Sequence, residues 1–209
     1  MSRKSINPGR VDWCGENPGI YLKHHQDDDQ YCVLSLFFRV VLSPYGRGNA
    51  AIVLAAPETR KGWPFETNFI LTDNMQMMRW IVDGWVTRMP TFSGKSGLQH
   101  MSWLHLDSVH KTPGDLKTEY RETLRGSGVT LEMIWQNMGP PLPVEVTVEN
   151  SATKEHEMYS VFLEAKSAQI SVNGTRLPGH AQERQFFGRT MSTAFLAFSE
   201  TWVTPEGGK

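Results

Sequence analysis

Runs of β-branched and aromatic residues, separated by short turns rich in Gly, Pro and Asn, cover most of this chain. Residues 31–42 are apolar on both faces of an extended chain, which predicts a central strand that is covered on both sides. A turn containing Gly and Pro follows, and residues 50–56 predict a second strand. Residues 65–71 predict a further extended segment.

The second half of the chain has the clearest strand pattern. Residues 117–125 and 129–137 alternate between apolar and polar positions and flank the turn Gly126-Ser127-Gly128, which predicts a β-hairpin. Residues 158–172 predict a strand long enough to bend or split, and Asn173-Gly174 favours a type I′ turn. Residues 186–203 predict the closing strands.

One segment has helical rather than strand periodicity. Residues 74–87 form this segment, in which Met75, Met78, Ile81, Val82 and Trp85 recur at helical spacing. Thr72 or Asp73 is the expected N-cap, and no proline interrupts the chain between residue 74 and Pro90. The stripe of Met and Trp is typical of core packing.

These elements together predict a mainly β protein with one main α-helix near residues 74–87. Roughly eight or more antiparallel strands favour a single closed β-barrel, because closure removes exposed strand edges. At 209 residues the chain suits one domain. We expect a loose N-terminal arm over residues 1–16, which are polar and interrupted by Gly and Pro, and one barrel-like domain over residues 17–209.

Composition narrows the functional classes. The net charge of −1 gives no reason to expect nucleic acid or a membrane surface as a partner. Only two cysteines occur, and the N-terminus has no apolar segment typical of a signal peptide, so we expect a cytoplasmic protein with reduced thiols. Glycine-rich phosphate loops are absent from the sequence, and no cofactor is expected. Whether the chain forms a homo-oligomer stays open.

The densest group of acid–base residues contains His100, His105, Asp107 and His110. On one strand, His100 and His110 would share a face, and His105 and Asp107 would share the other. This placement makes His105 a candidate general acid or base and Asp107 the residue that would orient it. The other interpretation is that His105 is an ordinary pocket or surface histidine.

Apolar and charged residues complete the predicted site. Seven Trp, ten Phe and ten Met supply walls for a small apolar ligand. The expected ligand contacts are Trp85, Trp103, Trp135 and Phe162. Arg79 is either a surface arginine or a carboxylate anchor. Lys166 lies either on the wet outer face or on the inner wall, where a charge has to be paired or functional.

One region resembles a known family. Residues 62–74, then Met78-Arg79 and residues 84–90, resemble the acetoacetate decarboxylase-like family. The resemblance implies a carboxylate-facing role for Arg79. In that family a Schiff-base lysine follows the proline, whereas here Thr91 follows Pro90. The side chain at that position therefore supplies no amine for a Schiff base, and Lys166 would need a lowered pKa to replace it.

Three functional hypotheses follow. The first is an enzyme with an apolar barrel pocket that catalyses cofactor-independent proton transfer, of the lyase, isomerase or cyclase type, with decarboxylase-like chemistry included. The second is a non-catalytic, lipocalin-like carrier of a small hydrophobic ligand. The third is a metal enzyme in which His105 and Asp107 join His100 or His110 and a glutamate, Glu119 or Glu132, although no metal site is assigned.

Overall fold

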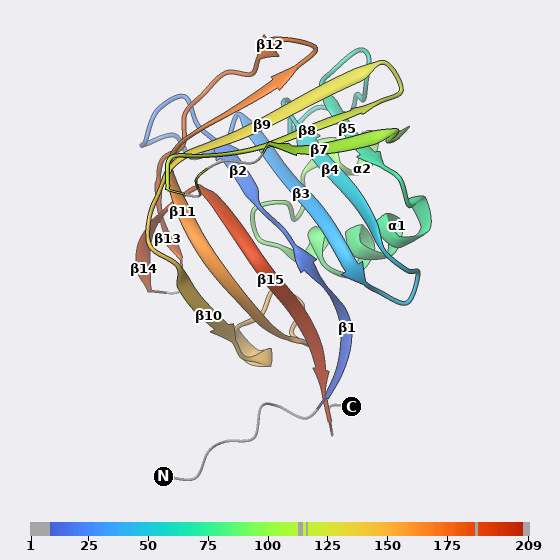
Figure 1. The fold of residues 1–209 in the computed structure, drawn as a ribbon. Coiled ribbons are helices and arrows are strands. Elements are labelled where there is room, and N and C mark those ends of the chain that lie inside the picture. The colour runs from blue at the N-terminus through green and yellow to red at the C-terminus, as the bar shows by residue number, and fades with distance from the viewer. Residues whose placement is uncertain (1–8, 113–114, 116, 187, 207–209) are drawn as a thin grey trace.

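The computed structural model describes residues 9–112, 115, 117–186 and 188–206, and the protein is mainly β. One large sheet contains most of the strands (Figure 1). Along the path of hydrogen-bonded neighbours, its strands are β6 (Ser102–His105), β5 (Asn68–Thr72), β4 (Gly48–Leu54), β3 (Val33–Leu42), β1 (Gly9–Glu16), β15 (Ala194–Pro205), β11 (Glu157–Val172), β9 (Val129–Met138), β8 (Glu119–Gly126) and β7 (Ser108–Thr112).

Shorter elements are attached to this path. Strand β2 (Gly19–Leu22) pairs with both β15 and β3, whereas β10 (Leu142–Val146) and β12 (Thr175–Arg176) pair with β11. A separate two-stranded hairpin consists of β13 (Glu183–Phe186) and β14 (Arg189–Ser192). The helical elements are α1 (Met75–Gly84), α2 (Ser96–His100) and the 3-10 turns η1 (Val86–Arg88) and η2 (Val148–Asn150).

Strands β6 and β7 stand at opposite ends of the sheet path, yet only Leu106 and Asp107 separate them in the chain. The Leu106 N–H donates to the carbonyl of Thr72 on β5, and the Asp107 N–H donates to the carbonyl of Arg125 on β8. Gly126 permits this approach, because a Cβ there would lie 2.1 Å from the carbonyl oxygen of His105. This segment therefore contacts both ends of the path.

The central strands bury apolar residues on both faces. On one face, residues such as Phe37, Val53 and Leu196 pack with Trp135 and other residues of β8 and β9, and we call this cluster the β8–β9 core. On the opposite face, Leu36, Ile52 and Phe195 pack toward α1, and we call that cluster the helix-side core. Figure 1 shows α1 and the β8–β9 hairpin as parts of two different layers.

A charged cluster is buried next to the β8–β9 core. Arg39 on β3 contacts Glu122 on β8 through both carboxylate oxygens, at 2.8 and 2.9 Å. The Tyr120 hydroxyl donates to Glu122 at 2.7 Å, and Glu16 forms a second ion pair with Arg39. The Glu122 side chain is fully buried, so Arg39 supplies the charge that compensates its removal from water.

Several predictions from the sequence are confirmed. The central strand is β3, and the β8–β9 hairpin turns at Ser127 and Gly128, which both have positive φ angles. The main helix is α1 followed by η1, close to the predicted residues 74–87, but its N-cap is Asn74, whose side chain accepts a hydrogen bond from the N–H of Met77. Strand β11 is continuous over 16 residues rather than split.

Two predictions are corrected. Residues 97–110 do not form one strand: His100 ends α2, His105 ends β6, and His110 lies in β7. A backbone hydrogen bond of 2.7 Å from Gly97 to Pro57 holds the start of α2, and the local sequence carries no sign of this contact. The expected sharing of faces by these histidines therefore does not hold. The predicted arm over residues 1–16 also differs, because residues 9–16 form β1, whereas residues 1–8 lie outside the described residues.

Within the described part of the chain, no helix is both long enough and apolar enough to cross a membrane.

The Arg39–Glu122 pair generates a stability prediction. We expect Arg39→Met to lower the free energy of unfolding by about 3–5 kcal/mol, because it leaves the buried Glu122 carboxylate without its cation. Urea denaturation measures this change. Arg121→Met is the matched control on β8, since Arg121 forms partly exposed ion pairs, and it should cost less than about 1 kcal/mol. Equal losses of unfolding free energy in the two variants would contradict the role of Arg39 as the cation that compensates the buried Glu122.

Candidate functional site

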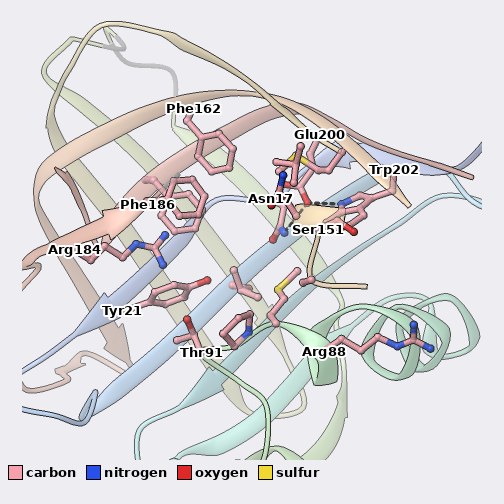
Figure 2. A pocket seen from close by; sticks show the side chains of 18 of the residues that line it. Asn17, Tyr21, Arg88, Thr91, Ser151, Phe162, Arg184, Phe186, Glu200 and Trp202 are labelled. Carbon is pink, nitrogen blue, oxygen red and sulfur yellow. Dashed lines mark hydrogen bonds between the residues drawn. The ribbon is translucent and has the colours of Figure 1, made fainter. Parts of the chain in front are cut away.

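A pocket of about 630 Å³ opens on the helix side of the sheet, within the size range of small-molecule sites. Strands β2, β11 and β15 form its floor, and the segments after η1 and η2 and the strand β13 surround it. Its lining residues are Asn17, Tyr21, Tyr31, Leu36, Arg88, Met89, Pro90, Thr91, Val146, Asn150, Ser151, Ala152, Lys154, Met158, Phe162, Arg184, Gln185, Phe186, Phe195, Glu200 and Trp202. Figure 2 shows most of them around one cavity.

The pocket belongs to the helix-side core. Its apolar lining residues, among them Tyr21, Phe195 and Trp202, are members of that cluster. None of the described residues of the β8–β9 core lines the pocket. A ligand in this cavity would therefore lie outside the core enclosed between the central strands and the β8–β9 hairpin.

Glu200 reaches the pocket because of an irregularity in β15. Phe198 pairs with Val161 and Thr201 pairs with Tyr159, so β15 contains one more residue than β11 between these two pairs. The extra residue is accommodated at Ser199, which has a φ of 53° in the left-handed region. A bulge of this kind reverses the alternation of side chains, and it turns Glu200 toward the helix-side face.

The Glu200 carboxyl group is held by two donors on one oxygen. The indole N–H of Trp202 donates to Oε1 at 2.7 Å, and the amide of Asn17 donates to the same atom at 3.2 Å. No described residue forms a hydrogen bond with Oε2. Glu200 is only 3% exposed, so this free oxygen belongs to a carboxyl group that is almost removed from bulk water.

Burial determines the charge state of Glu200. Removal from water raises its pKa from 4.5 to about 7, although the hydrogen bonds from Trp202 and Asn17 favour the ionised form. The carboxyl group is therefore balanced between its neutral and ionised states near neutral pH. Such a group can both donate and accept a proton.

The opposite side of the pocket carries a cation and a hydroxyl group. Arg184 extends from β13 over the ring of Tyr21, 5.1 Å from the ring centroid (Figure 2). Burial raises the pKa of Tyr21, so its hydroxyl stays protonated and is available as a donor. Figure 2 shows this hydroxyl directed toward the middle of the cavity, between Arg184 and Glu200.

The other two cations of the lining have protein partners. Arg88 forms an ion pair with Glu155 at 3.0 Å and points away from the cavity in Figure 2. The Lys154 ammonium group donates to the carbonyl of Glu149 at 2.6 Å. Arg184 and Glu200 are therefore the charged lining residues with groups left for a ligand.

The predicted catalytic residues lie elsewhere. His105 and Asp107 do approach each other, with 3.7 Å between Nε2 and Oδ1, but both side chains are about two-thirds exposed, at 68% and 66%. Arg79 is exposed and stacks over Trp103 with 4.3 Å to the ring centroid, beside a shallow surface depression. Lys166 is also exposed. None of these four residues lines the large pocket.

The predicted ligand contacts are dispersed. Phe162 lines the pocket. Trp85 is buried in the helix-side core, and Trp103 packs against that core from its edge. Trp135 is fully buried in the β8–β9 core, where its indole N–H donates to the carbonyl of Gly19 at 3.0 Å. Only one of the four residues is therefore placed to touch a ligand in this cavity.

The sequence reasoning missed Glu200, Arg184 and Tyr21. A glutamate between Phe198 and Trp202 in an apolar strand was the available signal for Glu200. Nothing local marks Arg184 or Tyr21, whose importance comes from their meeting across the fold. Among the residues that the structure describes, no three His, Cys, Asp or Glu side chains are grouped closely enough to hold a metal ion.

Comparison of the chain with known families, curated proteins and solved structures finds no match. The resemblance to the acetoacetate decarboxylase-like family stays a prediction from the sequence. The geometry and the chemistry of the pocket are therefore the remaining indications of a function.

The raised pKa of Glu200 generates a pH prediction. Between about pH 4.5 and 7 the native state holds a proton that the unfolded chain releases, so the free energy of unfolding falls as pH rises through this interval. The expected loss from Glu200 is about 3 kcal/mol by pH 8. We expect Glu200→Gln to remove this part of the pH dependence in urea denaturation at pH 5 and pH 8.

The exposed Glu145 on β10 provides the matched control. Glu145→Gln should keep the pH dependence of the wild type. If the free energy of unfolding of Glu200→Gln differed between pH 5 and pH 8 as much as that of the wild type, Glu200 would ionise normally in the folded protein.

Proposed function

We propose that this protein is a small-molecule enzyme that catalyses proton transfer without a cofactor, of the lyase or isomerase type. One observation carries the proposal: the buried Glu200 carboxyl group has a free oxygen in an aromatic pocket and a pKa of about 7. A general acid or base is most effective when its pKa lies near the working pH.

The neighbouring groups suit this chemistry. Trp202 and Asn17 fix Oε1 and so orient Oε2 for proton transfer. Tyr21 can donate a hydrogen bond to an oxygen that gains negative charge during the reaction, because its own hydroxyl remains protonated. The surrounding rings keep water away, which strengthens both interactions. The reaction that fits best is removal and return of a proton on a carbon next to a carbonyl group.

The decarboxylase-like resemblance enters this proposal in a modified form. Pro90 and Thr91, at the end of the segment that carries the resemblance, line the same pocket. Thr91 has no amine, so the proposed chemistry uses the Glu200 carboxyl group rather than a Schiff base.

A non-catalytic carrier is the second candidate. It is favoured by the aromatic lining, in which six rings surround a single acidic group. The six residues are Tyr21, Tyr31, Phe162, Phe186, Phe195 and Trp202. A carrier needs such a surface but has no use for proton exchange, so a direct assay of exchange separates the two functions.

The test is deuterium incorporation from heavy water into a panel of carbonyl compounds with acidic α-protons, followed by NMR. We expect the wild type to catalyse exchange on at least one compound and Glu200→Gln to slow it by about 10²–10⁴-fold. Glu145→Gln is the control and should exchange at the wild-type rate. Binding without exchange in the wild type would favour the carrier, and full activity of Glu200→Gln would remove Glu200 from the mechanism.

We also propose that the large sheet, which is antiparallel except for the parallel pair β5–β6, closes on itself as a barrel through Leu106 and Asp107. The hydrogen bonds of these residues to Thr72 and Arg125 support closure, as does the close approach of Gly126. Closure predicts slow hydrogen exchange of both amides, comparable with that of the β8–β9 hairpin. Fast exchange at both positions would favour an open sheet.

A further inference from the structure

Arg184 occupies an unusual environment within the pocket. Its guanidinium group lies 4.6 Å from the ring centroid of Phe186, 5.3 Å from that of Phe195 and 5.1 Å from that of Tyr21. The guanidinium group therefore lies over the faces of three rings, as in cation–π contacts. Among the described residues, no acceptor bonds to Arg184, and its Nε is buried without a hydrogen-bond partner.

An arginine that lies over aromatic rings, and whose terminal N–H groups have no acceptor among the described residues, is suited to a planar anion. A guanidinium group can match the two oxygens of a carboxylate. A ligand carboxylate would accept hydrogen bonds from the terminal nitrogens, because the Nε atom is buried out of its reach. Among the described lining residues Glu200 is the only acid; it lies on the other side of the cavity and already accepts two hydrogen bonds from its own neighbours.

The rings beside Arg184 favour a flat ligand body. Phe162 contacts both Phe186 and Phe195, with ring centroids 5.3 and 5.4 Å apart, and all three line the cavity. Tyr21 joins the group through Phe195 at 5.6 Å. Aromatic groups prefer stacked or edge-to-face contacts with other rings, so a continuous wall of this kind selects unsaturated ligands over flexible chains.

We infer that the ligand of this pocket is an aromatic or conjugated carboxylic acid, with its carboxylate on Arg184 and its flat body among Phe162, Phe186 and Phe195. The inference rests on the proposed function in one respect, which is that this pocket is the functional site. It adds that the ligand is a monoanion and that the end opposite its carboxylate faces Glu200.

Three probes test this inference by calorimetry at pH 6: trans-cinnamate, its neutral analogue trans-cinnamamide, and the aliphatic carboxylate hexanoate. We expect cinnamate to bind at least about tenfold more tightly than either of the others, as a charge-assisted hydrogen-bonded pair contributes 1.5–3 kcal/mol. Equal affinities for cinnamate and cinnamamide, or no cinnamate binding at about 1 mM, would overturn the inference.

Variants in the β13–β14 hairpin test whether Arg184 causes the preference for cinnamate. Arg184→Met should remove the preference for cinnamate over cinnamamide and leave cinnamamide binding unchanged. The matched control is Arg189→Met, because Arg189 is an exposed arginine on the partner strand β14, and it should keep the preference. Arg184→Lys retains a cation without the guanidinium group and should retain part of the preference, which keeps the test valid if the methionine variant does not fold. An unchanged preference in both Arg184 variants would exclude Arg184 as the anchor.

Glu200→Gln separates this inference from the proposed function. The variant should lose proton exchange but keep the preference for cinnamate, because Arg184 is intact. Cinnamate selectivity without exchange on any substrate would leave the ligand class standing and refute the enzyme. Proton exchange that depends on Glu200, in a protein without a preference for cinnamate, would support the enzyme and refute the inferred ligand class.

Discussion

The apolar character of both faces of the central strands is the constraint on which the rest of the structure depends. Strands such as β3 and β4 have almost no polar face to present to water, so each face must be covered by other elements. The β8–β9 hairpin covers one face and packs apolar side chains, Trp135 among them, against it. On the other face, the segment after η1, strand β10 and strand β13 surround a cavity, and Glu200 and Arg184 line it.

Local irregularity rather than a sequence motif gives this cavity its acid. In a regular strand, Glu200 would project to the same side as Leu196 and Phe198, toward the β8–β9 core. The bulge at Ser199 reverses that direction and places the carboxyl group among Trp202, Asn17 and the aromatic lining. The same burial that makes the folded state less stable when Glu200 ionises brings its pKa into the range useful for proton transfer. The proposed function and the loss of stability on ionisation thus have one physical cause at this position.

Two of the buried acids, Glu122 and Glu200, illustrate opposite solutions. Glu122 is fully buried next to Arg39, and the bidentate contact compensates the charge. Glu200 is buried without a cation in contact, and only neutral donors bind it. A paired acid stabilises a core, whereas an unpaired acid in a cavity retains the ability to exchange a proton. Arg184 shows the complementary state of a cation, since it lies over aromatic rings and no described residue accepts a hydrogen bond from its guanidinium group.

The sequence by itself determined the mainly β class, the central strand β3, the β8–β9 hairpin and the position of α1, because alternation, helical spacing and turn residues act over a few neighbours. It did not determine the site. The group His105 and Asp107 is prominent in the sequence, but tertiary structure leaves it on the surface, whereas Tyr21, Arg184 and Glu200 come together from strands far apart in the chain. Only the folded sheet decides which distant strands meet and where a bulge redirects a side chain, since both depend on long-range pairing that no local pattern records.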